Sequence, residues 1–129
     1  MKDTIRFIGL IRSSLKTLED CPLQEAEDAP EADIEIFDDY IDGIKDLKAG
    51  SEIVLLTWLH EADRSVIKCV TRRNDAMNPV GVFSTRSPDR PNPIGLHKTT
   101  IVRISKNKIK VSNLEALDQT PLIDIKPSF

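Results

Sequence analysis

The sequence has few of the residues on which disulfide frameworks and metal centres depend. Its 129 residues include two cysteines and two histidines, and Cys21, Cys69, His60 and His97 show none of the usual zinc spacings. No apolar run approaches the ~20 residues needed to span a bilayer. The N-terminal segment also has no signal-peptide pattern. We therefore expect a cytoplasmic protein with reduced thiols, no bound metal and no membrane association.

Several common catalytic signatures are also missing. The sequence has no G-x-G-x-x-G after a strand pattern, no P-loop and no G-x-S-x-G elbow. A Rossmann-type dinucleotide or methyl-donor site and a serine-hydrolase elbow are therefore not indicated. A chain of 129 residues is long enough for one hydrophobic core, so we assign a single domain to residues 1–129.

The net charge is small, but the charges are unevenly distributed along the chain. The formal net charge is −3, yet residues 15–63 hold 15 acidic and 3 basic side chains, whereas residues 64–110 hold 11 basic and 2 acidic ones. This division indicates either a basic face for an anionic partner or mutual neutralisation of the two halves within the fold. The sequence favours neither reading over the other.

The most distinctive composition is found in the proline-rich stretch Gly81–Gly95, GVFSTRSPDRPNPIG, which holds three prolines and two arginines. Proline fixes φ and restricts the residue before it, so this stretch predicts a rigid extended loop rather than a helix. We expect Arg86 and Arg90 to project from the loop, where a guanidinium suits a carboxylate or a phosphate. A surface turn with solvated arginines is the simpler alternative.

Elsewhere the chain is dominated by short strand patterns. One helix is predicted, at Asp39–Lys48, where Tyr40, Ile44 and Leu47 recur at helical spacing. Strands are predicted at Thr4–Ile11 with Ile5 and Phe7 inward, Asp33–Phe37 with Ile34 and Ile36 inward, Glu52–Leu59 with both faces buried, Ser65–Val70, Thr99–Ile104, Lys108–Ser112 and Leu122–Ile125. This pattern predicts a mainly β fold, a small closed or half-closed β-barrel with one short helix.

Three blocks of the sequence resemble the TsaA-like, or tRNA methyltransferase O, family. They are IGLIRSS at Ile8–Ser14, GVFSTRSPDRPNPIGLH at Gly81–His97 and LEALDQTPLIDIKP at Leu114–Pro127. The resemblance covers nearly the whole chain. It implies a β-barrel, S-adenosylmethionine as cofactor, and a homodimer with cofactor pockets near the subunit interface. It also implies methylation of the exocyclic amine of N6-threonylcarbamoyladenosine, next to the anticodon in tRNA.

The resemblance further implies a set of cofactor-binding residues. Carried over position by position, they are Gln24, Glu25, Ala26, His60, Glu61, Arg86, Leu96, Asp118, Gln119, Thr120 and Pro121. Arg86 would hold the methionine carboxylate, while Glu25 and Asp118 would serve the ammonium group or the ribose hydroxyls. Leu96 and Pro121 would pack on the adenine or on the carbons beside the sulfur.

The reaction itself would be an in-line displacement at the sulfonium methyl group. Most of the acceleration would come from holding donor and amine in line, with a nearby group to take the amine proton. His60 and Asp118 are the candidates for that catalytic role. Arg90 and Asn92, from the proline-rich stretch, are the candidates for contacts with the methyl acceptor.

The chain departs from the family pattern in two places. Leu23 stands where the family usually has an arginine, and the chain ends at Phe129, soon after the DIKP block, whereas longer members carry a C-terminal domain. It therefore resembles a short form. A chain of pI ≈ 5.4 binds tRNA well only if its basic residues gather on one face. Two alternatives stay open: a methyltransferase of a small molecule, and a non-catalytic module that binds S-adenosylmethionine.

Overall fold

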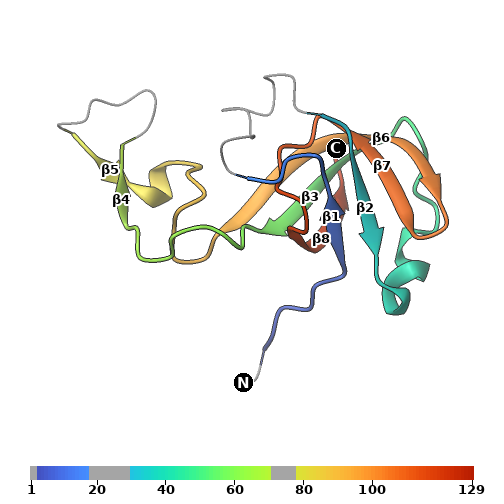
Figure 1. The fold of residues 1–129 in the computed structure, drawn as a ribbon, viewed down its shortest axis with the longest axis horizontal. Coiled ribbons are helices and arrows are strands. Elements are labelled where there is room, and N and C mark those ends of the chain that lie inside the picture. The colour runs from blue at the N-terminus through green and yellow to red at the C-terminus, as the bar shows by residue number, and fades with distance from the viewer. Residues whose placement is uncertain (1–2, 18–29, 71–77) are drawn as a thin grey trace.

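Six antiparallel strands pair in a closed barrel, in the order β1-β2-β7-β6-β3-β8 (Figure 1). The computed structural model describes residues 3–17, 30–70 and 78–129. The barrel strands are β1 (Gly9–Arg12), β2 (Ala32–Ile36), β3 (Glu52–Trp58), β6 (Ile94–Ser105), β7 (Lys108–Ser112) and β8 (Pro121–Pro127). Two further strands, β4 (Lys68–Cys69) and β5 (Val80–Gly81), pair with each other in a separate ribbon. The mainly β fold predicted from the sequence is confirmed.

Apolar side chains that alternate along the strands fill the barrel. As predicted, β2 directs Ile34 and Ile36 inward, and β7 adds Ile109 and Val111; all four are buried. The rest of the buried core comprises Ile11, Ala32, Ile53, Leu55, Ile101, Leu114, Ala116 and Leu122. The barrel therefore encloses a packed core, and polar side chains at alternate positions are left on its outer wall.

The first strand is shorter than predicted. β1 begins at Gly9, and Ile5 and Phe7, which were expected to face inward, are 50% and 39% exposed. The reason is the lack of a neighbour: β2 ends at Ile36, where Gly9 pairs with it, and the chain then turns away. Apolar and polar residues do alternate before Gly9, but no strand pairs with that segment to extend the sheet.

The predicted helix is a 3₁₀ helix, η2 (Asp38–Ile44), rather than an α-helix. Its apolar side was identified correctly, because Tyr40, Ile44 and Leu47 pack against the core. The segment is too short to overcome the cost of α-helix nucleation, and tight 3₁₀ turns are usual in connections of this length.

Two other strand predictions need correction. β3 is central, between β6 and β8, but its residues alternate between buried and half-buried, so only one face lies in the core. The strand predicted at Ser65–Val70 is reduced to β4, because its partner β5 is only two residues long. The β6–β7 hairpin is confirmed, although β6 begins at Ile94 rather than Thr99 because it pairs along the whole of β3.

Three of the connections between barrel strands leave the barrel at one end, which we call the loop end. Because neighbouring strands are antiparallel, this end gathers the last residues of β1, β3 and β7 and the first residues of β2, β6 and β8. The connections span residues 13–31, 59–93 and 113–120. In Figure 1 the connection of residues 59–93, with β4 and β5, extends to the left of the barrel. Helix η2 and the β6–β7 turn lie at the other end.

Candidate functional site

Most of the predicted cofactor residues in the described ranges lie on segments that adjoin at the loop end, whereas Arg86 lies on the 59–93 connection. Strand register brings them together, because Thr57 pairs with Leu122 and Trp58 pairs with Ile94. The residues on these adjoining segments are His60 and Glu61 after β3, Leu96 in β6, and Asp118, Gln119, Thr120 and Pro121 at the start of β8. Gln24, Glu25 and Ala26 lie outside the described residues, so their role stays a prediction.

The turn before β8 is held against the chain at the end of β1. The amide of Gln119 donates to the carbonyl of Ile11 at 2.6 Å, and the amide of Asp118 donates to the carbonyl of Leu15 at 2.7 Å. Thr120 is buried, and its hydroxyl donates to the carbonyl of Leu117 at 2.7 Å. Gln119 has a φ of 68° and an exposed side chain. The turn therefore presents Asp118 and Gln119 from a fixed backbone.

Asp118 is an ionised carboxylate in a well-defined environment. It accepts a hydrogen bond from the amide of Ser13 at 2.9 Å, and Nζ of Lys16 lies 3.0 Å from its other oxygen. The Ser13 amide, with a smaller contribution from Lys16, lowers the pKa of Asp118 against the opposing effect of partial burial. A carboxylate with a lowered pKa is a weak proton acceptor. Asp118 therefore suits an ammonium or hydroxyl group better than it suits proton transfer, and His60 stays a candidate for the latter.

The proline-rich stretch is folded around one of its own arginines. Arg90 was expected to project, but its Nη2 donates to the carbonyl of Val82 and, at 2.6 Å, to that of Thr85. The hydroxyl of Thr85 also donates to the Val82 carbonyl, at 2.9 Å, at the end of the short 3₁₀ helix η3 (Val82–Ser84). Arg86 is exposed, as predicted. Arg90 therefore shapes the loop that carries Arg86, and its contact with an acceptor stays a prediction.

A second arginine, which the sequence did not single out, ties the two ends of the 59–93 connection together. Nε of Arg64 donates to the carbonyl of Pro91 at 2.7 Å, and its Nη2 lies 3.4 Å from Oδ1 of Asn92. Its guanidinium also stacks over the ring of Trp58, 5.1 Å from the centroid. The residue order alone gives no signal for Arg64, because its hydrogen-bond partners, Pro91 and Asn92, are 27 and 28 residues away in the sequence.

His97 is another residue that the motifs did not identify as functional. It is buried, and its Nε2 is hydrogen-bonded to Oγ1 of Thr57 at 2.8 Å. Gly95 lies directly above this pair, since a Cβ there would come within 2.5 Å of the Thr57 hydroxyl and 2.7 Å of the His97 ring. Leu96 points to the opposite face and is 50% exposed. Alternation along β6 thus separates an inner polar pair from an outer apolar side chain.

Two further observations concern metal binding and membrane spanning in the described part of the chain. Within residues 3–17, 30–70 and 78–129, no three metal-ligating side chains cluster together. No helix in those same ranges has the length and apolar composition required to cross a membrane.

Comparison of the sequence with known proteins finds a matching family model and several similar proteins. The model of the tRNA-methyltransferase O N-terminal domain matches residues 10–129. A protein of Methanothermobacter thermautotrophicus named "Probable S-adenosyl-L-methionine-binding protein" is 41% identical over 129 residues, covering 100% of this chain and 92% of its own. An S-adenosyl-L-methionine-binding protein of Archaeoglobus fulgidus is 40% identical over 119 residues, covering 92% of this chain and 84% of its own.

Comparison of the structure gives the same family. The crystal structure of TrmO from Pseudomonas aeruginosa matches with a TM-score of 0.78 and 28% sequence identity. The match covers 100% of this chain and 57% of the other, so the chain spans a little over half the length of that solved protein. The resemblance drawn from the three sequence blocks is confirmed: the chain belongs to the tRNA-methyltransferase O N-terminal domain family.

Proposed function

We propose that this chain binds S-adenosylmethionine at the loop end and methylates tRNA, at the N6 amine of threonylcarbamoyladenosine next to the anticodon. This proposal rests mainly on the strand register, which brings residues from three separate segments to one end of the barrel. Membership of the family and the names of the relatives support the same cofactor. We expect the protein to act in the cytoplasm.

The side chains at the loop end fit the chemical groups of this cofactor. Asp118 offers an ionised carboxylate to an ammonium group or ribose hydroxyls, and Arg86 offers an exposed guanidinium to a carboxylate. Leu96 offers an exposed apolar side chain to the adenine. When bound, S-adenosylmethionine supplies an electrophilic methyl group. The residues of the chain would bind and orient donor and acceptor, and orientation is the larger part of catalysis in such a transfer.

His60 is the proposed acceptor of the proton from the attacking amine. It follows β3 at the loop end and is exposed, so an acceptor can approach its ring. An imidazole is the side chain that most often takes up a proton in enzymatic general acid–base catalysis. Arg90 and Asn92 remain proposed contacts for the acceptor, with Arg90 acting chiefly through the shape of the loop.

We also propose that the protein is a homodimer whose interface includes the outer face of β6 near the loop end. Ile94 and Leu96 are exposed there, although both are apolar. A partner copy that covers them would also deepen the site beside Leu96. Light scattering should give about twice the 14.5 kDa mass of one chain, and a monomer at assay concentration would contradict this part of the proposal.

Mass spectrometry of tRNA nucleosides tests the proposed reaction. Transfer RNA that carries the threonylcarbamoyl group should gain one labelled methyl group on the modified adenosine, and tRNA without that group should gain none. A His60→Ala variant should lose turnover to a much greater extent than it loses donor binding. The relatives are named for donor binding alone, so a non-catalytic binding module is the second candidate function. Donor binding in the presence of a chelator, without product on any tRNA, would favour that candidate or a small-molecule methyltransferase.

A further inference from the structure

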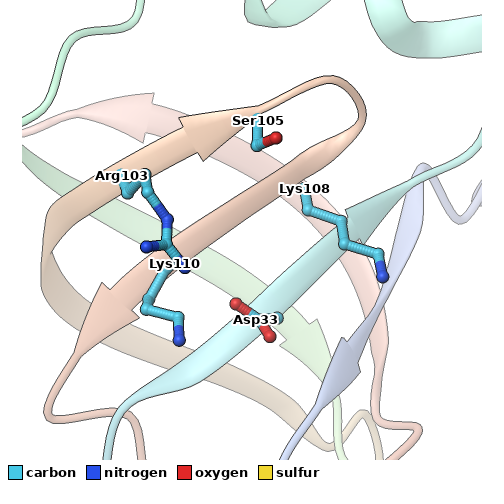
Figure 2. Close-up of a pocket in the computed structure, with 5 residues that line it drawn as sticks. All are labelled: Asp33, Arg103, Ser105, Lys108 and Lys110. Atoms are coloured by element: carbon cyan, nitrogen blue, oxygen red, sulfur yellow. The ribbon is translucent and has the colours of Figure 1, made fainter.

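The outer wall of the barrel carries a groove that the loop-end site does not use. The groove has a volume of about 350 Å³ and lies across β2, β7 and β6 (Figure 2). It is lined by three basic side chains, one hydroxyl and one carboxylate: Arg103, Lys108, Lys110, Ser105 and Asp33. We call it the basic groove.

The packing of the barrel forces these cations onto one surface. Ile109 and Val111 of β7 are buried in the core, so the alternate residues Lys108 and Lys110 must face outward. A register shift between Ile101 and Arg103 then aligns Arg103 of β6 with Lys110. Figure 2 shows the side chains on the same face of the three strands.

The charge of the groove is only partly offset by its surroundings, although β2 places Asp33 opposite Lys110 and Glu35 opposite Lys108. Residues 98–112 contain five basic side chains and no acidic one. Of the ion pairs between described residues, none involves Arg103, Lys108 or Lys110. The facing strand β2 contributes two carboxylates, but Glu35 is bound to Nε of Arg12 at 3.0 Å. Asp33 is therefore the one acidic side chain lining the groove, against three cations.

The groove meets the loop end at Asp33, the second residue of β2 and the register partner of Arg12, whereas Arg103 and Lys108 lie farther away. Leu96 and Arg103 lie on the same strand seven residues apart, a span of roughly 23 Å at about 3.3 Å per residue. A folded RNA is large enough to contact both the loop end and these cations. Residues 98–112 contain no aromatic side chain on which a base could stack. Ammonium, guanidinium and hydroxyl groups instead match the oxygens of a phosphate backbone.

We propose that the basic groove binds the phosphate backbone of a folded RNA and is a second contact for the acceptor, remote from the methyl-transfer site. The proposal rests on the proposed function, in that the RNA is the tRNA acceptor. It also resolves how an acidic chain of pI ≈ 5.4 can bind a polyanion: part of its basic half is gathered on one wall.

The test is the salt dependence of tRNA binding, measured by fluorescence anisotropy with labelled tRNA. The groove variant is Lys108→Gln with Lys110→Gln, and the matched control is Lys45→Gln with Lys48→Gln, two exposed lysines near η2. Each lost phosphate contact lowers the slope of log affinity against log salt by about 0.7–0.9. The wild type should therefore lose about tenfold more affinity than the groove variant between about 50 and 200 mM salt. The control should keep the wild-type slope.

Donor binding by calorimetry serves as the folding readout, because neither pair of lysines lies at the loop end. If the double groove variant does not fold, Lys108→Gln alone should fold, because Lys108 is exposed, and should give half the change in slope. The charge-retaining change of both groove lysines to arginine should keep the wild-type slope. Equal slopes for groove and control variants would overturn the proposal. Groove-dependent binding to phosphatidylserine vesicles, without groove-dependent binding to tRNA, would also overturn it.

The proposed RNA contact in the basic groove and the proposed methyl transfer can be contradicted independently of each other. A wild-type protein that binds tRNA with the groove-dependent slope but transfers no methyl group would contradict the proposed activity and leave the groove intact. A protein that methylates tRNA equally well with and without the groove lysines, at every salt concentration, would contradict the groove alone.

Discussion

The barrel and the 59–93 connection are built on different principles. In the barrel every strand pairs on both sides, and core residues such as Ile34, Leu55 and Ile109 have no exposed surface. In the connection the strands are two residues long, and Phe83 and Ile67 are 82% and 64% exposed. Burial of apolar surface stabilises the barrel, and it contributes much less to the connection.

Polar contacts from a few side chains give the connection its shape. The guanidinium groups of Arg64 and Arg90 donate to backbone carbonyls at both ends of the proline-rich stretch, and the carboxylate of Asp89 accepts from the amide of Asp63 at 2.8 Å. Such contacts define a local conformation and add little to the global stability of the barrel, because the connection can open without exposing the barrel core. Substitutions in the barrel should therefore change stability, and substitutions in the connection should change binding.

The largest effect is expected for Gly9→Ala in the barrel. A Cβ at this buried position would lie 2.3 Å from the backbone carbonyl oxygen of Glu35, so β1 and β2 would have to separate. We expect a loss of about 3 kcal/mol in the free energy of unfolding, at the upper end for overpacking. Gly81→Ala in the connection is the control, because nothing lies within 4 Å of its Cβ position. Urea denaturation measures both, and equal midpoints would contradict the comparison.

The second-largest effect is expected for Arg86→Lys, and it is an effect on donor binding rather than on stability. Lysine keeps the charge but loses the planar fork that pairs with a carboxylate. We expect affinity for S-adenosylmethionine to fall by roughly 1.5–3 kcal/mol, the range for hydrogen bonds to charged groups, with an unchanged unfolding midpoint. Calorimetry measures the affinity.

Arg103→Lys is the matched control for that variant, since Arg103 faces outward from β6 and keeps its charge. It should leave donor affinity unchanged. Unchanged donor affinity in the Arg86→Lys variant, together with weaker tRNA binding, would instead assign Arg86 to an RNA phosphate.

The smallest effect is expected for Asp118→Asn, at the border between barrel and connections. The pKa of Asp118 is lowered in the folded state, so its charge contributes stability above its ordinary value of 3.8. That contribution is lost as the pH falls through the lowered pKa. We expect the wild type to exceed the variant by at most about 1 kcal/mol at neutral pH, because the Lys16 partner is exposed. The difference in unfolding free energy should narrow below about pH 4; a gap that is constant from pH 7 to pH 3 would refute this assignment.

Local alternation was enough to predict part of the fold. Ile34, Ile36 and the β6–β7 hairpin were identified correctly, because neighbours in the sequence set their facing and their turn. Ile5 and Phe7 were misplaced, because whether a strand exists there depends on a partner distant in the sequence. Periodicity reports which side of a segment is apolar, but not what lies beside it.

Only part of the candidate site could be predicted from the sequence. The family resemblance singled out His60, Arg86 and Asp118, and the strand register explains why the segments that carry His60 and Asp118 lie at one end. The inward turn of Arg90 and the tie made by Arg64 were not predictable, because their main partners are backbone carbonyls. The basic groove depends on a register shift between two strands, which residue order alone does not reveal.

Closure of the barrel also determines how copies of the chain can associate. β1 pairs with β8 as well as with β2, so each of the six barrel strands has a neighbour on both sides. No barrel strand therefore has a free edge along its whole length, although the pairing is staggered, so that residues 94–99 of β6 pair with β3 alone. Addition of a strand from a second chain is thus limited to short stretches of the barrel, whereas the exposed side chains of Leu96 and Ile94 on its outer wall are available to a specific partner.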